Sequence, residues 1–227
     1  MFLWFLNDPL HTLQTIIFKK EYRFVCTMES AIPDENQVFS HELKIPKERV
    51  AVVIGTEGET KKKLEDNCSV KLDINSEEGD VFISGKDAFK LFTAKEVVRA
   101  IGRGFNPNIA LNLLKGDIVF ELINLKDIVK NKNHLMRLKG RIIGTEGKTR
   151  KIIEDLTMSS LSVYGKTVGI IGRAEYVSVA KESVEMIIKG SPHASVYKFL
   201  EMKRKTLRPG FGEEDAIADE FKKFQEE

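Results

Sequence analysis

Four residues, Gly-Thr-Glu-Gly, occur twice in this chain of 227 residues, at positions 55–58 and 144–147. The copies are 89 positions apart, and over the twelve residues that start at each first glycine the sequences are identical at eight. A repeat of this length is longer than the unit of a solenoid protein and matches the size of a small independent domain. The duplication therefore predicts two copies of one domain in tandem.

Each copy shows the same order of predicted elements. In the first copy, alternation predicts a strand at residues 42–45, and Pro46 opens a helix that ends at the glycine loop. A helix at residues 60–66, strands at 69–74 and 81–84, and a helix at 86–101 follow. The corresponding segments of the second copy are 118–125, 134–143, 149–155, 161–164, 167–171 and 174–188. The predicted fold class is α+β, with a three-stranded sheet and three helices in each domain.

The same pattern predicts the domain boundaries. We expect an N-terminal extension at residues 1–38, a first domain at 39–104, a connector with a short helix at 105–116, and a second domain at 117–190. Residues 191–227 should form a C-terminal helix and a weakly ordered tail.

The N-terminal extension carries two apolar runs, at residues 2–6 and 13–18, and no basic leading region. The runs are too short and interrupted for a membrane span, and the segment does not match a signal peptide. Two interpretations stay open: an upstream extension before a natural start at Met28, or an arm that docks on a partner through Trp4 and Phe5.

Composition excludes several classes of function. The only cysteines, Cys26 and Cys68, have no metal-like spacing, which argues against a disulfide framework or zinc site and favours a reducing, cytoplasmic location. The four histidines are scattered, and neither a paired carboxylate nor a nucleophile with its base stands out. We expect no catalytic residue, no metal site and no cofactor, and therefore no enzyme.

The run Gly147-Lys148-Thr149 matches the end of the phosphate-binding loop of nucleotide hydrolases. That motif needs a glycine five residues before Gly147, where this chain has Ile142. The first copy also has Glu59 in place of the lysine. The spacing therefore excludes nucleotide hydrolysis.

A Gly-x-x-Gly turn between two helices lets another backbone approach closely, because its glycines lack Cβ atoms. The amides at the start of the following helix favour anions at the same place. This arrangement is typical of the KH domain, whose loop clamps about four nucleotides of single-stranded nucleic acid. The order strand-helix-helix-strand-strand-helix is that of the type I (eukaryotic-style) KH domain. Glu57 and Glu146 depart from the pattern, since a carboxylate there must point to solvent or weaken binding.

Charge distinguishes the two copies. Residues 41–66 contain six Lys/Arg and six Asp/Glu, whereas residues 130–155 contain eight and three, a net charge of +5. Because phosphate contacts dominate affinity for nucleic acids, the second domain should bind RNA more strongly. The predicted RNA-binding residues are Ile54, Gly55, Thr56, Glu57, Gly58, Lys61 and Lys62 in the first copy and Arg141, Ile143, Gly144, Thr145, Glu146, Gly147, Lys148, Arg150 and Lys151 in the second.

Several blocks, in order along both domains, carry a resemblance to a known family. They are residues 100–105 with 110–114, residues 139–144 with 147–149, and residues 180–184 with 190–192 and 196–197. Over roughly residues 42–205, the chain resembles the archaeal tandem KH ribosome-assembly factor, the counterpart of the eukaryotic partner-of-Nob-one protein.

This resemblance implies a non-catalytic factor that binds small-subunit precursor rRNA near its 3′ end. It also implies assistance to the endonuclease that matures this end and contact with the alpha subunit of translation initiation factor two. The second loop is then the expected RNA clamp, while the first can also serve protein partners. Two alternatives stay open: a tandem KH transcription elongation factor of the NusA type, and a scaffold for protein interactions. The strand before the first helix of each copy argues against the NusA type.

Overall fold

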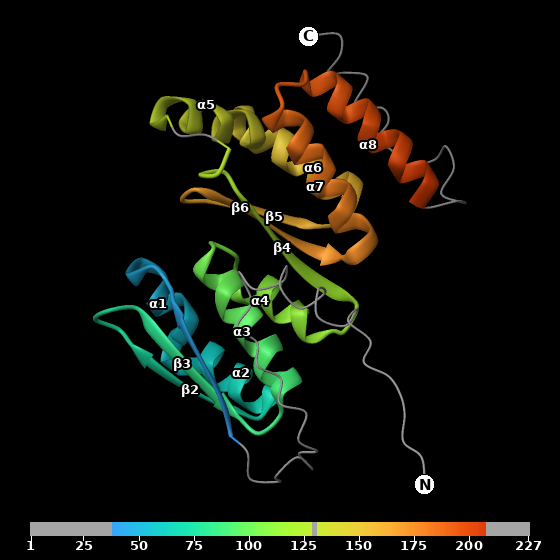
Figure 1. Cartoon of the computed structure of the whole chain (residues 1–227). Helices are drawn as coiled ribbons and strands as arrows, with labels where there is room; N and C mark the ends of the chain where they lie inside the picture. Colours follow the sequence, from blue (N-terminus) through green and yellow to red (C-terminus); the bar gives the residue numbers. More distant parts are fainter. Residues whose placement is uncertain (1–37, 129–130, 208–227) are drawn as a thin grey trace, which may run out of the picture. The chain divides into compact units, whose positions relative to one another are not determined.

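The computed structural model describes residues 38–128 and 131–207 of the chain (Figure 1). The first domain runs through β1 (Phe39–Lys44), α1 (Lys47–Ile54), the short 3-10 turn η1 (Thr56–Gly58), α2 (Glu59–Cys68), β2 (Val70–Asn75), β3 (Asp80–Gly85) and α3 (Ala88–Gly102). Its three strands form an antiparallel sheet in the order β1-β3-β2. The predicted order of elements is confirmed, and β1 begins three residues earlier than predicted because Phe39 pairs with Gly85.

The connector contains α4 (Pro107–Ala110) and the 3-10 turn η2 (Leu111–Leu114). The second domain follows with β4 (Ile118–Asn124), α5 (Lys132–Ile143), η3 (Thr145–Gly147), α6 (Lys148–Thr157), β5 (Ser160–Tyr164), β6 (Thr167–Arg173) and α7 (Ala174–Ile188). The antiparallel sheet order β4-β6-β5 repeats that of the first domain. Helix α8 (His193–Leu207) is the last element of the described residues, and it lies within the segment at 191–227 in which a helix was predicted.

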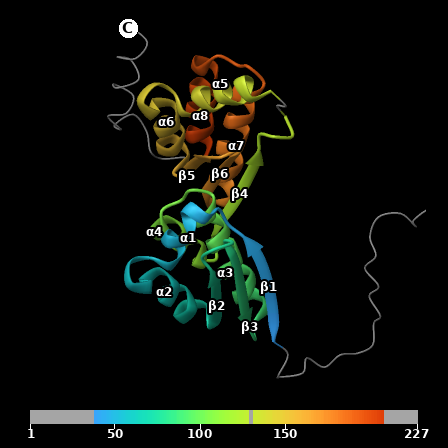
Figure 2. The ribbon, with the colours of Figure 1, turned by 90° about the vertical axis from the view of Figure 1, so that its left-hand side faces the viewer.

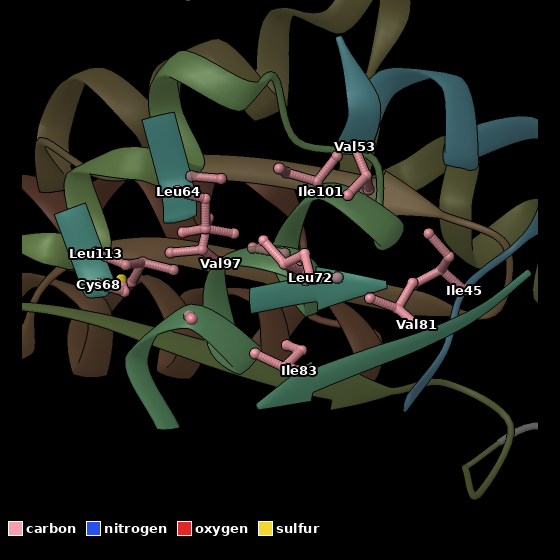
Figure 3. Close-up of a cluster of buried hydrophobic side chains, with 14 of the residues drawn as sticks. Ile45, Val53, Leu64, Cys68, Leu72, Val81, Ile83, Val97, Ile101 and Leu113 are labelled. Carbon is pink, nitrogen blue, oxygen red and sulfur yellow. The ribbon is translucent and has the colours of Figure 1, made fainter. Parts of the chain in front are cut away.

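Each domain buries one face of its sheet under helices (Figure 2). In the first domain, Val81 and Ile83 alternate along the central strand β3 and pack with apolar side chains of α1, α2 and α3, among them Val53, Leu64 and Val97 (Figure 3). Buried apolar residues recur at every second position on the strands and about every 3.6 positions on the helices, as the sequence pattern predicts. The α+β class is therefore confirmed.

A glutamate at the same position of α2 and α6 has a structural role. Glu65 accepts a hydrogen bond from the backbone N–H of Leu72 at 2.8 Å, and Glu154 accepts one from Leu161 at 2.7 Å. Each bond ties the second helix of a domain to the next strand. Part of the identity between the copies therefore reflects folding and not ligand binding.

The connector packs on the second sheet. Strand β6 is buried along both faces up to Arg173, and a Cβ atom at Gly169 would lie 2.7 Å from the ring of Phe105. Phe105 is buried and meets Phe120 of β4 edge to face, with ring centroids 5.9 Å apart. The segment predicted as a linker thus contributes to the core.

The predictions for the N-terminal extension, the C-terminal tail and the two cysteines concern residues that the structure describes only in part. The interpretations of residues 1–27, and the predicted tail beyond Leu207, lie outside the described residues. Cys68 is a free thiol whose pKa is raised by burial. Within residues 38–128 and 131–207, no helix combines the length and the apolar character that a bilayer crossing requires.

Candidate nucleic-acid interface

The two glycine loops have the same backbone conformation. Gly55 and Gly144 have φ/ψ of 77°/175° and 75°/175°, a region that is open essentially to glycine alone. Each ends the first helix of its domain through a hydrogen bond from its N–H, to Ala51 in one case and Gly140 in the other. The duplicated sequence therefore encodes a duplicated turn.

The first glycine of each loop is required by packing. A Cβ atom at Gly55 would lie 2.8 Å from the backbone nitrogen of Thr60, and one at Gly144 would lie 2.7 Å from that of Thr149. Real Cβ atoms do not approach other atoms this closely. These glycines hold the second helix against the end of the first.

The second glycine of each loop faces open space. Gly58 and Gly147 lie in the left-handed region, at φ 77° and 79°, and a Cβ atom at either position would have no neighbour within 4 Å. Packing inside the protein therefore does not explain a glycine here. The free space leaves the backbone open to a close ligand, which is what a clamp on a nucleic-acid backbone needs.

The loop carboxylates point away from the protein. Glu57 and Glu146 are exposed and have positive φ angles of 53° and 51°. Neither forms a hydrogen bond or ion pair with another described residue. Each carboxylate therefore lies at the exposed rim of its loop, without a cation of the described residues beside it.

The second loop borders a pocket of about 460 Å³. Among the described residues, three cations line it, Arg137, Arg141 and Lys148, and no carboxylate does. One wall comes from α8, whose His193 and Tyr197 also line the pocket. The arrangement is a cationic hollow at the start of a helix, which suits a phosphate group.

Helix α8 is fastened to the loop region by two polar contacts. The hydroxyl groups of Tyr197 and Thr149 lie 3.0 Å apart, and Nε2 of His193 is 2.9 Å from the backbone oxygen of Arg141. Sequence reasoning treated His193 as a scattered surface or capping residue. No spacing could have revealed these contacts, because 48 and 52 residues separate the partners.

Arg141 has a structural role beside its predicted one. Its guanidinium donates to the backbone oxygens of Ile187, at 3.0 Å, and Ser191, at 2.5 Å. These bonds hold the end of α7 and the start of the following turn against α5. Arg141 thereby places α8 beside the loop, and its contact with RNA stays a prediction.

Beside the glycine loops, ion pairs neutralise more cations on α2 of the first domain than on α6 of the second domain. Lys63 pairs with Glu59 at 2.5 Å, and this contact lowers the pKa of the Glu59 carboxyl; Lys61 lies 4.0 Å from Glu65. In the second domain, Arg150 pairs with Glu154 at 3.4 Å. Within the described residues, Lys62 and Lys151 form no ion pair.

A groove for bases needs apolar side chains that stay partly exposed. In the second domain, Ile143, Ile152 and Val163 meet this condition, on α5, α6 and β5. At the matching positions the first domain has Ile54, Lys63 and Ile74. The apolar position of Ile152 is thus a lysine, Lys63, in the first domain. This difference is visible in the alignment of the two copies, but the sequence predictions above do not use it.

The predicted RNA-binding residues gather at the two loops, each set in its own domain. The exposed members are Thr56, Glu57, Lys62, Thr145, Glu146, Lys148, Arg150 and Lys151. The half-buried members are Ile54, Gly55, Gly58, Lys61, Arg141, Ile143, Gly144 and Gly147.

Family models match both domains. Residues 119–205 match a eukaryotic-type (type I) KH domain, the second KH domain of PNO1, and residues 40–100 match a KH domain. The two predicted type I KH domains are therefore confirmed.

The chain is similar to proteins from archaea and eukaryotes. It is 49% identical over 170 residues to the KH domain-containing protein MJ0443 of Methanocaldococcus jannaschii, covering 73% of this chain and 74% of that protein. It is 35% identical over 104 residues to the pre-rRNA-processing protein PNO1 of Debaryomyces hansenii, covering 45% of this chain and 41% of the yeast protein.

Among solved structures, the chain resembles Dim2p of Pyrococcus horikoshii in a complex with a/eIF2alpha and rRNA. The two are 44% identical with a TM-score of 0.71, over 76% of this chain and 97% of that one. Together with the two glycine loops and the repeated sheet order, these similarities assign the chain: it belongs to the archaeal Dim2p and PNO1 family of tandem KH proteins, which are non-catalytic RNA-binding factors.

Proposed function

We propose that this chain binds the 3′ region of small-subunit precursor rRNA as a single strand and assists the endonuclease that matures this end. The observation that carries the proposal is the pocket at the second glycine loop, which Arg137, Arg141 and Lys148 line and to which no residue in the described part of the chain adds a carboxylate. The rRNA in the complex of the Pyrococcus Dim2p and the name of the yeast relative support RNA of the ribosome as the ligand.

The mechanism follows from the loop geometry. Gly147 leaves the backbone open to a nucleotide backbone, and the first amides of α6 point toward the same place. Ile143, Ile152 and Val163 offer apolar surface on which unstacked bases can lie. The protein then contributes binding and positioning, and the partner enzyme cuts the bond.

The first domain has a weaker RNA loop in this proposal. Lys61 and Lys63 are engaged by glutamates, and Lys63 replaces an apolar groove residue. We infer that this loop is available to a protein partner as well. The alpha subunit of initiation factor two is the candidate, because a/eIF2alpha is present in the complex of the Pyrococcus relative.

The test is a reconstituted cleavage assay. A precursor RNA that extends past the mature 3′ end is incubated with the purified chain, with the maturation endonuclease, and with both. The proposal expects protection of the 3′ region by the chain alone, no cutting by the chain alone, and more accurate or faster cutting by the mixture. RNA binding that shows no preference for single-stranded 3′-end sequence over an unrelated strand of equal length would contradict it.

A further inference from the structure

The first domain contains a second cationic hollow that shares no residue with its glycine loop. This pocket of about 620 Å³ lies where β1 ends, α1 begins and the C-terminal half of α3 passes. Within the part of the chain that the structure describes, five cations line it and only one carboxylate, that of Glu78. The cations are Lys44, Lys47, Lys95, Arg99 and Arg103. We propose that this pocket binds a phosphate group of the RNA strand, outside the nucleotides held by a glycine loop.

Ion pairs leave most of this charge uncompensated. Lys44 lies 3.0 Å from Asp80, and Arg99 lies 3.3 Å from Glu96. The other three cations of the pocket form no ion pair with any residue that the structure describes. Two of them, Lys95 and Arg103, are half-buried. An anionic group such as a phosphate of a nucleic-acid backbone would compensate this charge.

Helix stability does not account for the charges. Arg99 and Arg103 lie at the C-terminal end of α3, where the helix dipole favours cations. Lys47 is the first residue of α1, where the dipole disfavours a cation, and Lys95 lies in the middle of α3. These two lysines therefore carry the argument, since a ligand explains them and the fold does not.

The second domain repeats the cations of this pocket only in part. Helices α3 and α7 both have 15 residues, and aligning them places Glu185 at the position of Arg99 and Ile188 at that of Gly102. Lys181, the counterpart of Lys95, forms an ion pair with Glu121 at 3.1 Å. The pocket is thus a feature of the first domain and not a general property of the fold.

Gly102 explains how the pocket forms. A Cβ atom at this position would lie 2.8 Å from Cγ2 of Ile45, so the glycine lets α3 approach the end of β1. That approach brings the cations of α3 toward Lys44 and Lys47. A backbone phosphate suits an open hollow of this kind, because it can keep part of its hydration while lysine and arginine neutralise it.

The inference rests on the proposed function, since it assumes that the chain holds RNA. The test uses the full chain and a double variant, Lys47→Glu with Lys95→Glu. The matched control is Lys86→Glu with Lys90→Glu. Lys86 lies just before α3 and Lys90 in its first turn, and neither lines the pocket. Both variants change the net charge equally, so a difference between them reports the location of the charge.

Affinity is measured by fluorescence anisotropy for two single strands of the rRNA 3′ region, over a series of salt concentrations. One strand has about four nucleotides, the length that a glycine loop clamps, and the other is several times longer. We expect the pocket variant to bind the long strand about tenfold more weakly than the control does. The slope of log Kd against log salt should fall by about 0.7 for each lost phosphate contact. The short strand should not distinguish the variants.

Equal affinities of the pocket variant and the control for the long strand would overturn the inference. This also holds if the pocket variant, at equal RNA affinity, no longer binds an acidic protein partner. If those two affinities are equal but Gly147→Asp still weakens RNA binding by about 30-fold, the proposed function stands while the inference fails. If the unmodified chain binds neither strand, the proposed function fails. Circular dichroism checks the fold, and Lys47→Gln with Lys95→Gln, against a matching glutamine control, replaces any glutamate variant that does not fold.

Discussion

Replacing the second glycine of each loop by aspartate should separate the two domains by their contribution to RNA binding. Gly58 and Gly147 have nearly the same φ and the same open surroundings. The substitutions Gly58→Asp and Gly147→Asp therefore place the same new charge in the same backbone setting. Any difference in RNA affinity between them reports the surroundings of the loops.

The cost to folding should be small and equal. A non-glycine residue in the left-handed region costs about 1–2 kcal/mol, and aspartate is among the residues that tolerate it best. No side-chain clash is added, since a Cβ atom meets nothing within 4 Å at either position. Both variants should unfold at similar temperatures, only a few degrees below the unmodified chain.

The cost to binding should differ. An aspartate several ångströms from a bound phosphate costs about 2 kcal/mol at an intermediate dielectric. For Gly147→Asp this corresponds to a loss of about 30-fold in affinity. For Gly58→Asp we expect about threefold, because the loop of the first domain, where Lys61 and Lys63 are already paired with glutamates, contributes less to binding.

Fluorescence titration of single-stranded 3′-end rRNA with the unmodified chain, Gly58→Asp and Gly147→Asp measures the two losses in affinity. Thermal unfolding of each protein serves as the control for folding. Equal losses in the two variants, or a larger loss for Gly58→Asp, would refute the assignment of the main clamp to the second domain. A shallow salt dependence of the unmodified chain would refute a contact led by phosphate.

The same loops lead to three further expectations. Glu146→Lys should tighten RNA binding at low salt by about 1 kcal/mol or more, because the exposed carboxylate repels phosphate; an unchanged Kd would show that the side chain is remote from the ligand. Gly144→Ala should lower the free energy of unfolding by about 2 kcal/mol or more, since the φ/ψ region of Gly144 is nearly closed to alanine and the new Cβ atom would crowd Thr149. Denaturant titration measures this loss. The control is Gly140→Ala, which should not lose stability because its Cβ atom meets nothing within 4 Å. The purified chain should neither hydrolyse nucleotides nor cut RNA, and magnesium-dependent cleavage that a point substitution in this chain removes would contradict its non-catalytic assignment.

The sequence by itself determined the tandem organisation, the order of elements and the location of both glycine loops. These features depend on local patterns: periodicity, the Pro46 helix start and glycines between two helices. The type I KH fold follows from the order strand-helix-helix-strand-strand-helix, which both copies share. Net charge in matched windows, which is a property of composition alone, also distinguishes the two loops.

Only the tertiary structure decided which side chains from distant parts of the sequence lie beside each loop. Tyr197 and His193 reach the second loop from α8, and Arg141 turns its guanidinium to backbone oxygens of Ile187 and Ser191. The pocket of the first domain brings Lys44 and Lys47 together with cations of α3 across about 50 residues of chain. Sequence periodicity assigns a face to each residue within one element, but it does not say which face of a distant element will lie opposite. Packing of the two cores makes that choice, and with it the cations that RNA can reach.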